Sequence, residues 1–173
     1  AERLERRAES LARLHHPNIV PLLGVARDGD TLLLVSAEGE GRPLHMRLAQ
    51  SGSRLPAEEV AAIGEQVCAA LQYGHTRGVV HGALGMATIA LGDGGTVQLS
   101  EYAVALTVQP EVQAEPSADL YRLGATLYEA LTGHPPLPNS DPRTAPTPLE
   151  GVLLRCVADD PRERYDSPEE LAQ

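Results

Sequence analysis

Residues 78 to 91 read GVVHGALGMATIAL. The stretch holds three glycines, one histidine and otherwise mainly apolar side chains, a pattern typical of a rigid loop that leads into a buried strand. His81 is the one side chain in it that can accept a proton from a substrate, and nothing in it would hold a metal ion well. The stretch therefore predicts a loop shaped for packing that carries little chemistry of its own.

The composition of the 173 residues is that of a soluble globular protein, with 42% hydrophobic and 22% charged side chains. This length is enough for one domain with a real core. The chain has no Lys, so all 14 basic side chains are Arg, and its net charge is −10. Such an acidic chain without an Arg stripe argues against a nucleic-acid groove and against contact with an anionic membrane surface.

Metal, disulfide and membrane signals are weak. Cys68 and Cys156 lie far apart inside helical patterns, and the six His residues do not cluster at metal-ligand spacing. We expect two buried thiols in a reducing compartment and no metal site. No signal peptide and no long apolar run occurs, so the expected location is the cytoplasm.

Periodicity alone predicts an α+β domain of mostly helical content. Apolar residues at helical spacing, with helix start and stop signals, predict helices at 2–14, 43–50, from 56 to beyond 71, 120–131, 149–158 and from 167 onward. Short β-rich runs between turn residues predict strands at 18–25, 31–35, 79–80, 89–91 and 96–99. A hairpin turn is expected at 27–30, a polar break at 39–41 and a Pro-rich loop at 134–148.

Five stretches in the same order resemble the eukaryotic-type Ser/Thr protein kinase domain of bacteria. They are LARLHHPNIVPLLG at 11–24, GVVHGALGMATIAL at 78–91, VQLSEYAVA at 97–105, SADLYRLGATLYEALTGHPPL at 117–137 and CVADDPRERYDSPEEL at 156–171. The resemblance implies a protein-kinase-like α+β fold, truncated at its N-terminus. It further implies a partial small lobe at 1–38, with the regulatory helix and a remnant hairpin, and a helical C-lobe at 39–173.

Within this resemblance, the positions that carry the family's chemistry hold other residues. The pattern H-R-D-L-K-P-x-N aligns with the loop, so Ala83 stands where the proton-accepting Asp is expected. The other changed positions are Gly82 for Arg, Gly85 for Lys, Thr88 for Asn, Glu101 for the metal-binding Asp and Arg7 for the regulatory-helix Glu, while His81 keeps the family's His. The chain thus lacks the usual base, and we expect no catalytic residue in it.

The positions that would surround a nucleotide are also reduced. They are Ser36 at the gatekeeper, Ala37 beside it, Ala90 at the adenine floor and Glu101. The family uses ATP and Mg²⁺, but we expect this chain to bind no cofactor.

The family's structural positions are retained. Asp119 matches the Asp that holds the catalytic-loop backbone, and Glu111 and Arg164 match an ion pair that ties the activation segment to the closing helices. The resemblance further implies that Leu11, His81 and Tyr102 stack in a packed column.

These patterns favour a pseudokinase that is not an enzyme and that serves as a protein-binding or regulatory scaffold. Its expected partner is a protein, either an active kinase or a phospho-reading domain. Two alternatives remain open: an atypical active Ser/Thr kinase that binds ATP with an N-lobe encoded upstream, and a truncated remnant without a role of its own.

Overall fold

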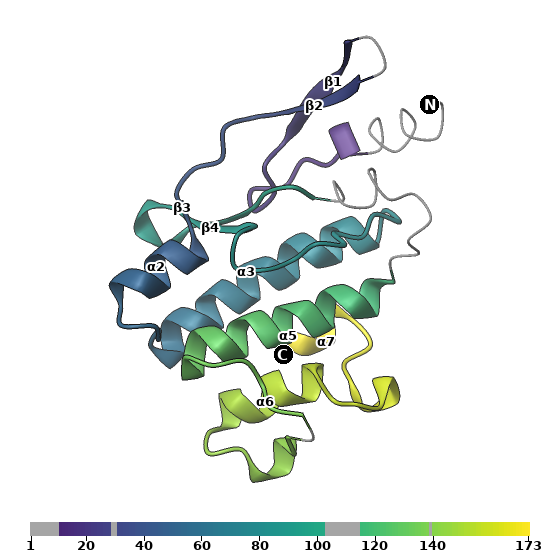
Figure 1. Ribbon diagram of the computed structural model, residues 1–173. Coiled ribbons are helices and arrows are strands. Elements are labelled where there is room, and N and C mark those ends of the chain that lie inside the picture. The colour runs from purple at the N-terminus through teal and green to yellow at the C-terminus, as the bar shows by residue number, and fades with distance from the viewer. Residues whose placement is uncertain (1–10, 29–30, 103–114, 139) are drawn as a thin grey trace.

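The computed structural model describes residues 11–28, 31–102, 115–138 and 140–173. A two-stranded hairpin lies at one end of a helical body, and a small three-stranded sheet lies beside that body (Figure 1). The predicted α+β class is confirmed. Most of the helix expected at 2–14 lies outside the described residues, and its described end at 11–12 is helical.

The hairpin consists of β1, Leu22–Asp28, and β2, Thr31–Ser36, which pair antiparallel with an irregularity between Leu22 and Gly24. The second strand matches its prediction, whereas the first begins later and runs further than the predicted 18–25. The reason is that Ile19 bridges in parallel to Leu99 in the other sheet and the Val20 N–H donates to the Leu99 carbonyl. These contacts divert residues 19 and 20 from the hairpin.

The second sheet has the order β3, β4, β5, all antiparallel, formed by Arg42–Pro43, Ile89–Leu91 and Val97–Leu99. The pattern predicted β4 and β5 but gave no sign of the two-residue β3. The strand predicted at 79–80 is wrong, because those residues form no ladder. The Val79 N–H instead turns back to the Gly74 carbonyl at the end of the preceding helix.

The helices follow the predicted order. They are α2, Leu44–Gln50; α3, Ala57–His75; α5, Pro116–Thr132; α6, Pro148–Cys156; and α7, Pro168–Leu171. Helix α5 ends at Gly133, whose φ of 82° closes the helix in the left-handed conformation that glycine adopts without strain. The Ser167 side chain accepts the Glu170 N–H at the start of α7, as the capping pattern predicted.

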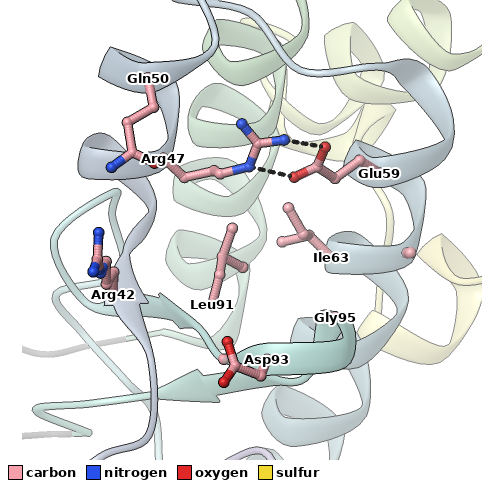
Figure 2. Close-up of a pocket in the computed structure, with 10 residues that line it drawn as sticks. Arg42, Arg47, Gln50, Glu59, Ile63, Leu91, Asp93 and Gly95 are labelled. Carbon is pink, nitrogen blue, oxygen red and sulfur yellow. Dashed lines mark hydrogen bonds and ion pairs between the residues drawn. The ribbon is translucent and has the colours of Figure 1, made fainter.

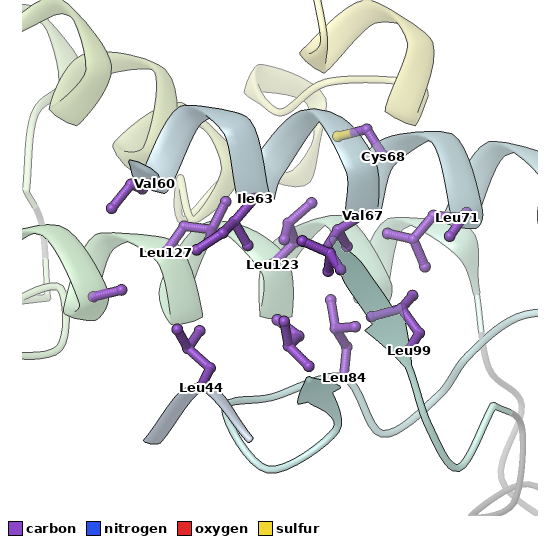
Figure 3. Packing of buried hydrophobic residues seen from close by; sticks show 14 of the residues in the cluster. Leu44, Val60, Ile63, Val67, Cys68, Leu71, Leu84, Leu99, Leu123 and Leu127 are labelled. Carbon is purple, nitrogen blue, oxygen red and sulfur yellow. The ribbon is translucent and has the colours of Figure 1, made fainter. Parts of the chain in front are cut away.

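The core forms where α3 and α5 run side by side and face the small sheet (Figure 3). Helix α3 contributes Val60, Ile63, Val67 and Leu71, all buried. Leu123 and Leu127 of α5 and Leu99 of β5 pack against them, together with Leu44 and Leu84. Both cysteines are buried free thiols, and burial raises the pKa of each to about 12, so they serve as small apolar residues.

A polar network joins α3 to the small sheet. The Asn18 amide donates to the Gln66 Oε1 at 3.0 Å and to the Val97 carbonyl at 2.7 Å. The Gln66 side chain also accepts the Val97 N–H and donates to the Gly95 carbonyl. These bonds fix the sheet, and with it the loop that precedes β4, on the helical body.

Close packing of α5 on α6 gives a first prediction. A Cβ added at Gly124 would collide with the Cys156 Cβ, with the Leu153 carbonyl oxygen only 3.1 Å away. Gly124→Ala should therefore lower the free energy of unfolding by about 1–3 kcal/mol, because overpacking outweighs the better helix propensity of Ala. Urea denaturation measures this change in the free energy of unfolding. The matched control is Gly24→Ala, whose Cβ would meet nothing within 4 Å and should change little; equal stability of the two variants would contradict the tight α5–α6 contact.

Candidate functional site

The loop at 78–91 is fastened to α5 by one buried carboxylate. Asp119 lies in the first turn of α5 and is fully buried. Its two oxygens accept the His81 N–H at 2.8 Å, the Gly82 N–H at 2.9 Å and the His75 Nε2–H at 2.9 Å. Since bonds to a charged acceptor are stronger than neutral ones, this cluster holds the loop backbone in one shape.

The middle of the loop is closed by its own short-range bonds. Gly82 has φ 78°, a value that strains any residue with a Cβ. The Ala83 N–H donates to the His81 Nδ1 at 3.3 Å. The Thr88 hydroxyl accepts the Gly85 N–H at 3.0 Å and donates to the Gly85 carbonyl at 3.1 Å. The hydroxyl of buried Thr88 is thus used inside the loop, and residues 83 and 85 present no ionisable group.

His81 stacks on Tyr102, which lies shortly after the end of β5. The rings of His81 and Tyr102 lie 4.8 Å apart between centroids, and both side chains are buried. The Tyr102 hydroxyl donates to the Ala70 carbonyl of α3 at 3.5 Å, and burial raises the pKa of this phenol. Leu11 is buried and lines the same cleft as Tyr102. The stacked aromatic pair links the loop, β5 and α3.

Burial lowers the pKa of His81, although the nearby Asp119 carboxylate and the Ser100 backbone favour the charged ring. Burial and the Arg77 charge lower the pKa of His16 in the same direction. Both imidazoles bind a proton more readily in the unfolded chain, whose His pKa is 6.5. Their contribution to stability is therefore fully present above pH 6.5 and is lost as the pH falls toward the lower folded-state values.

The free energy of unfolding should accordingly decrease from pH 7 toward pH 5, and His81→Phe should make this decrease shallower. Phenylalanine keeps a ring against Tyr102 but cannot bind a proton. Urea titrations at several pH values measure the slope for both proteins. A variant slope as steep as that of the parent would show that His81 does not titrate on unfolding.

A cleft of about 480 Å³ lies between the hairpin, residues 11–20 and the end of β5. Apolar side chains make most of its lining, and the polar ones are those of Ser36, Ser100, Glu101 and Tyr102. Glu101 is exposed, has φ 55° and carries the one carboxylate of this lining. The described residues thus offer one carboxylate and no cation, a lining that does not fit a magnesium-bound triphosphate on its own.

The structure brings some of the predicted residues together and leaves others apart. Leu11, Ser36, Ala37, Glu101 and Tyr102 share the cleft. Ala90 lies half-buried in β4 and does not line it. Arg7 and Glu111 lie outside the described residues, so the predicted Glu111–Arg164 pair stays a prediction.

Arg164 is placed near α5 by contacts of its own. Its Nε donates to the Ala158 carbonyl at 2.8 Å, and its guanidinium lies 4.9 Å from the Tyr121 ring centroid. Together with Arg122 and Leu84 it lines a shallow hollow on α5.

His75 is a site residue that the sequence did not reveal. It occupies the last turn of α3, and its Nε2–H donates to Asp119, which lies 44 positions further along the chain. Basic side chains are common in the last turn of helices, so the sequence position of His75 did not mark it as a site residue. Only the packing of α3 against α5 identifies the carboxylate that it contacts.

No group of three or more His, Cys, Asp or Glu that could hold a metal occurs among the described residues. In the same part of the chain, no helix combines the length and apolarity needed to cross a bilayer.

Comparisons with known proteins agree on one family. A family model described as protein tyrosine and serine/threonine kinase matches residues 1–117. The probable serine/threonine-protein kinase CPE1738 of Clostridium perfringens is 24% identical over 98% of this chain and 30% of its own length. PrkC of Bacillus subtilis is 24% identical over 98% of this chain and 32% of its own length. PkaA of Streptomyces coelicolor is 30% identical over 99% of this chain and 38% of its own length.

A solved structure shares the fold. The crystal structure of Rad53 1–466 in complex with AMP-PNP aligns with a TM-score of 0.82 at 20% identity, covering all of this chain and 54% of that one. The predicted kinase-like fold is confirmed by this likeness. This chain spans about a third of the length of the bacterial relatives it matches.

The relatives correct one expectation from the sequence. The chain was expected not to be an enzyme, but the matching relatives are named serine/threonine protein kinases and the family model is that of a kinase. Nothing in the described residues shows inactivity. Substituted positions in the loop and elsewhere in the chain are not enough to remove it from a family of enzymes.

Proposed function

Since the chain belongs to the protein tyrosine and serine/threonine kinase family, we propose that it is a regulatory domain that binds a protein partner through the kinase fold. The partner is a serine/threonine kinase domain of the type found in the bacterial relatives. Binding depends on the shape of the loop at 78–91 and does not require the Glu101 carboxylate.

The observation that carries this proposal is the Asp119 cluster. This fully buried carboxylate accepts three hydrogen bonds, two from the loop backbone and one from His75. Burying a charge is costly unless it is paired and hydrogen-bonded. The cluster supports a role for the loop that depends on its conformation.

The loop itself supports the same role. Thr88 uses its hydroxyl on Gly85, and Ala83 presents a methyl group. A surface of this kind can fit a partner by shape. Without ionisable groups at these positions, it would bind a charged substrate only weakly.

A second candidate function is phosphoryl transfer to Ser or Thr, and the observation that favours it is the position of Glu101. Its carboxylate lines the cleft in the strained left-handed conformation, and strain of this kind persists mainly where the surrounding structure requires it. A carboxylate there could bind a cation. Transfer in this family depends chiefly on positioning and charge stabilisation, so this role would rest on Glu101.

The test measures both roles with the same protein. The autophosphorylation rate of the PrkC kinase domain is followed with and without an excess of this chain, and binding is measured by isothermal titration calorimetry. We expect saturable binding and a change in rate of about twofold or more. An unchanged rate without binding contradicts a kinase partner of this class. Labelled phosphate transferred by the chain alone, and lost in Glu101→Gln, establishes the second function.

A further inference from the structure

The two cysteines of the chain lie far apart in the sequence, at positions 68 and 156, and both are buried free thiols. Cys68 belongs to α3, and Cys156 is the last residue of α6. Neither takes part in the Asp119 cluster or lines the cleft that contains Glu101. Any approach of the two sulfur atoms is therefore a result of tertiary packing alone.

The packing of α3 on α5 brings Cys68 level with Gly124. A Cβ added at Gly64 of α3 would lie 3.1 Å from the Leu127 Cδ1 of α5, and the last turn of α3 contacts the first turn of α5. The two helices therefore run antiparallel. Cys68 lies one turn after Gly64 and Gly124 lies one turn before Leu127, so each pair shares a helix face. Since one turn advances a helix by about 5.4 Å, both steps lead to the same level of the interface.

Gly124 is also the point at which Cys156 approaches α5. A Cβ added at Gly124 would collide with the Cys156 Cβ and would lie 3.2 Å from the Cys156 sulfur. The missing side chain thus lets Cys156 come against α5 at the level that Cys68 occupies on α3. Burial raises the pKa of the Cys156 thiol, and the charge of an ionised Cys68 raises it further. This electrostatic interaction supports the closeness that the packing indicates.

The direction of Cys68 fits the same arrangement. In Figure 3 its sulfur lies on the opposite side of α3 from Leu99 and the small sheet. Helix α6 packs against α5, and α7 packs against α3. The exposed fraction is 3% for Cys68 and 0% for Cys156. The two thiols are thus enclosed between α3, α5 and the helices at the C-terminal end of the described chain.

Helix α3 holds Cys68 firmly. Near the start of this helix, the Arg47 guanidinium of α2 donates to the two Glu59 oxygens at 3.1 and 3.0 Å (Figure 2). At its end, His75 contacts the buried Asp119. Cys68 lies in the middle of these 19 residues, away from both ends. It should stay in place when nearby segments open locally.

Cys156 is in a less protected position. It ends α6, a helix of nine residues, and helix ends open more readily than helix interiors. Its neighbour Arg155 pairs with Glu170 at 2.9 Å, but the two side chains are 43% and 39% exposed, and exposed pairs contribute little to stability. Local opening should therefore uncover Cys156 before Cys68.

We propose that Cys68 and Cys156 are a disulfide-forming pair, oxidised by hydrogen peroxide, whose bond ties the end of α6 to the middle of α3. The Cys156 sulfur attacks a peroxide oxygen, the O–O bond breaks, and a sulfenic acid and one water form. The Cys68 sulfur then attacks the Cys156 sulfur, the S–O bond breaks, and a second water leaves. Two thiols are oxidised, one peroxide is reduced, and each thiol proton ends in a water molecule.

This inference goes beyond the proposed function, because it requires no partner protein. It also predicts a slow reaction. Burial raises the pKa of each thiol to about 12, and the thiolate is the form that attacks peroxide. The oxidation rate should therefore increase with pH, and it should increase in urea concentrations below the unfolding midpoint, where α6 opens more often.

The test treats the purified chain with hydrogen peroxide and analyses it by mass spectrometry without a reductant. We expect an intact mass lower by two hydrogen atoms and a tryptic product in which residues 55–77 are joined to residues 156–162. Dithiothreitol should reverse both changes. The oxidised chain should melt about 5–15 °C above the reduced one, because the bond closes a loop of about 90 residues and restricts the unfolded chain.

Single variants establish the order of the two steps. Cys68→Ala should retain a sulfenic acid at Cys156, which dimedone captures, whereas Cys156→Ala should be labelled several times more slowly. Peroxide should give neither variant the joined peptides or a higher Tm. Should either variant fail to fold, the joined peptides of the wild-type chain and its Tm still decide whether the bond forms.

Three results overturn the inference. The first is a gain of oxygen at the cysteines without the joined peptides at any urea concentration below the midpoint. The second is a disulfide that links two chains in place of one within a chain. The third is an oxidised chain that melts at or below the Tm of the reduced chain, since the bond would then fit only an unfolded state. Faster labelling of Cys156→Ala than of Cys68→Ala contradicts the proposed order.

Discussion

Replacing Asp119 with Ala is expected to lower the free energy of unfolding by about 3–5 kcal/mol, the range for removing one partner of a buried charged cluster. The substitution leaves the His81 and Gly82 N–H groups and the His75 Nε2–H without their acceptor. Each buried unsatisfied polar group costs about 1–3 kcal/mol. Because single domains are stable by only about 5–15 kcal/mol, the variant should unfold at a much lower urea concentration.

The matched control is Asp93→Ala. Asp93 is exposed and its carboxylate makes no ion pair within the described residues, so this change should shift stability by no more than about 0.5 kcal/mol. Similar urea midpoints for the two variants would mean that the Asp119 cluster does not hold the loop in solution.

Replacing Leu123 with Ala should be the next most severe change. Leu123 is fully buried between α3 and α5 (Figure 3), and truncation of a core Leu costs about 2–5 kcal/mol because a cavity remains. Leu137→Ala serves as the control, since Leu137 is 67% exposed. Differential scanning calorimetry should show a large fall in Tm for the first variant only. A small effect of Leu123→Ala would mean that the α3–α5 interface collapses around the cavity.

The sequence predicted the elements whose pattern is strong and local. Helices α3 and α5 follow from apolar residues at helical spacing, and α7 from its capping residues. Predictions failed where distant contacts override local preference. Residues 19 and 20 pair with Leu99, and Val79 bonds back to Gly74, so neither stretch forms the strand that its apolar run suggests.

The candidate site was predictable to a similar degree. The loop and the role of Asp119 followed from the family resemblance, which the fold likeness supports. The contact of His75 with Asp119 and the network of Asn18 and Gln66 were not predictable, because each joins residues that only tertiary packing brings together. The two-residue strand β3 was not predictable either, because so short a segment leaves no periodic signal in the sequence.

The central claim is that the shape of the loop carries the function, independently of the Glu101 carboxylate. The most direct measurement is the PrkC autophosphorylation rate in the presence of two variants of this chain, Gly82→Val and Glu101→Gln. A branched side chain is strained at the Gly82 φ of 78°, so Gly82→Val should distort the loop and abolish the effect on PrkC, while Glu101→Gln should retain it. Circular dichroism confirms that both variants are folded. Loss of the effect with Glu101→Gln and its retention with Gly82→Val would contradict the account.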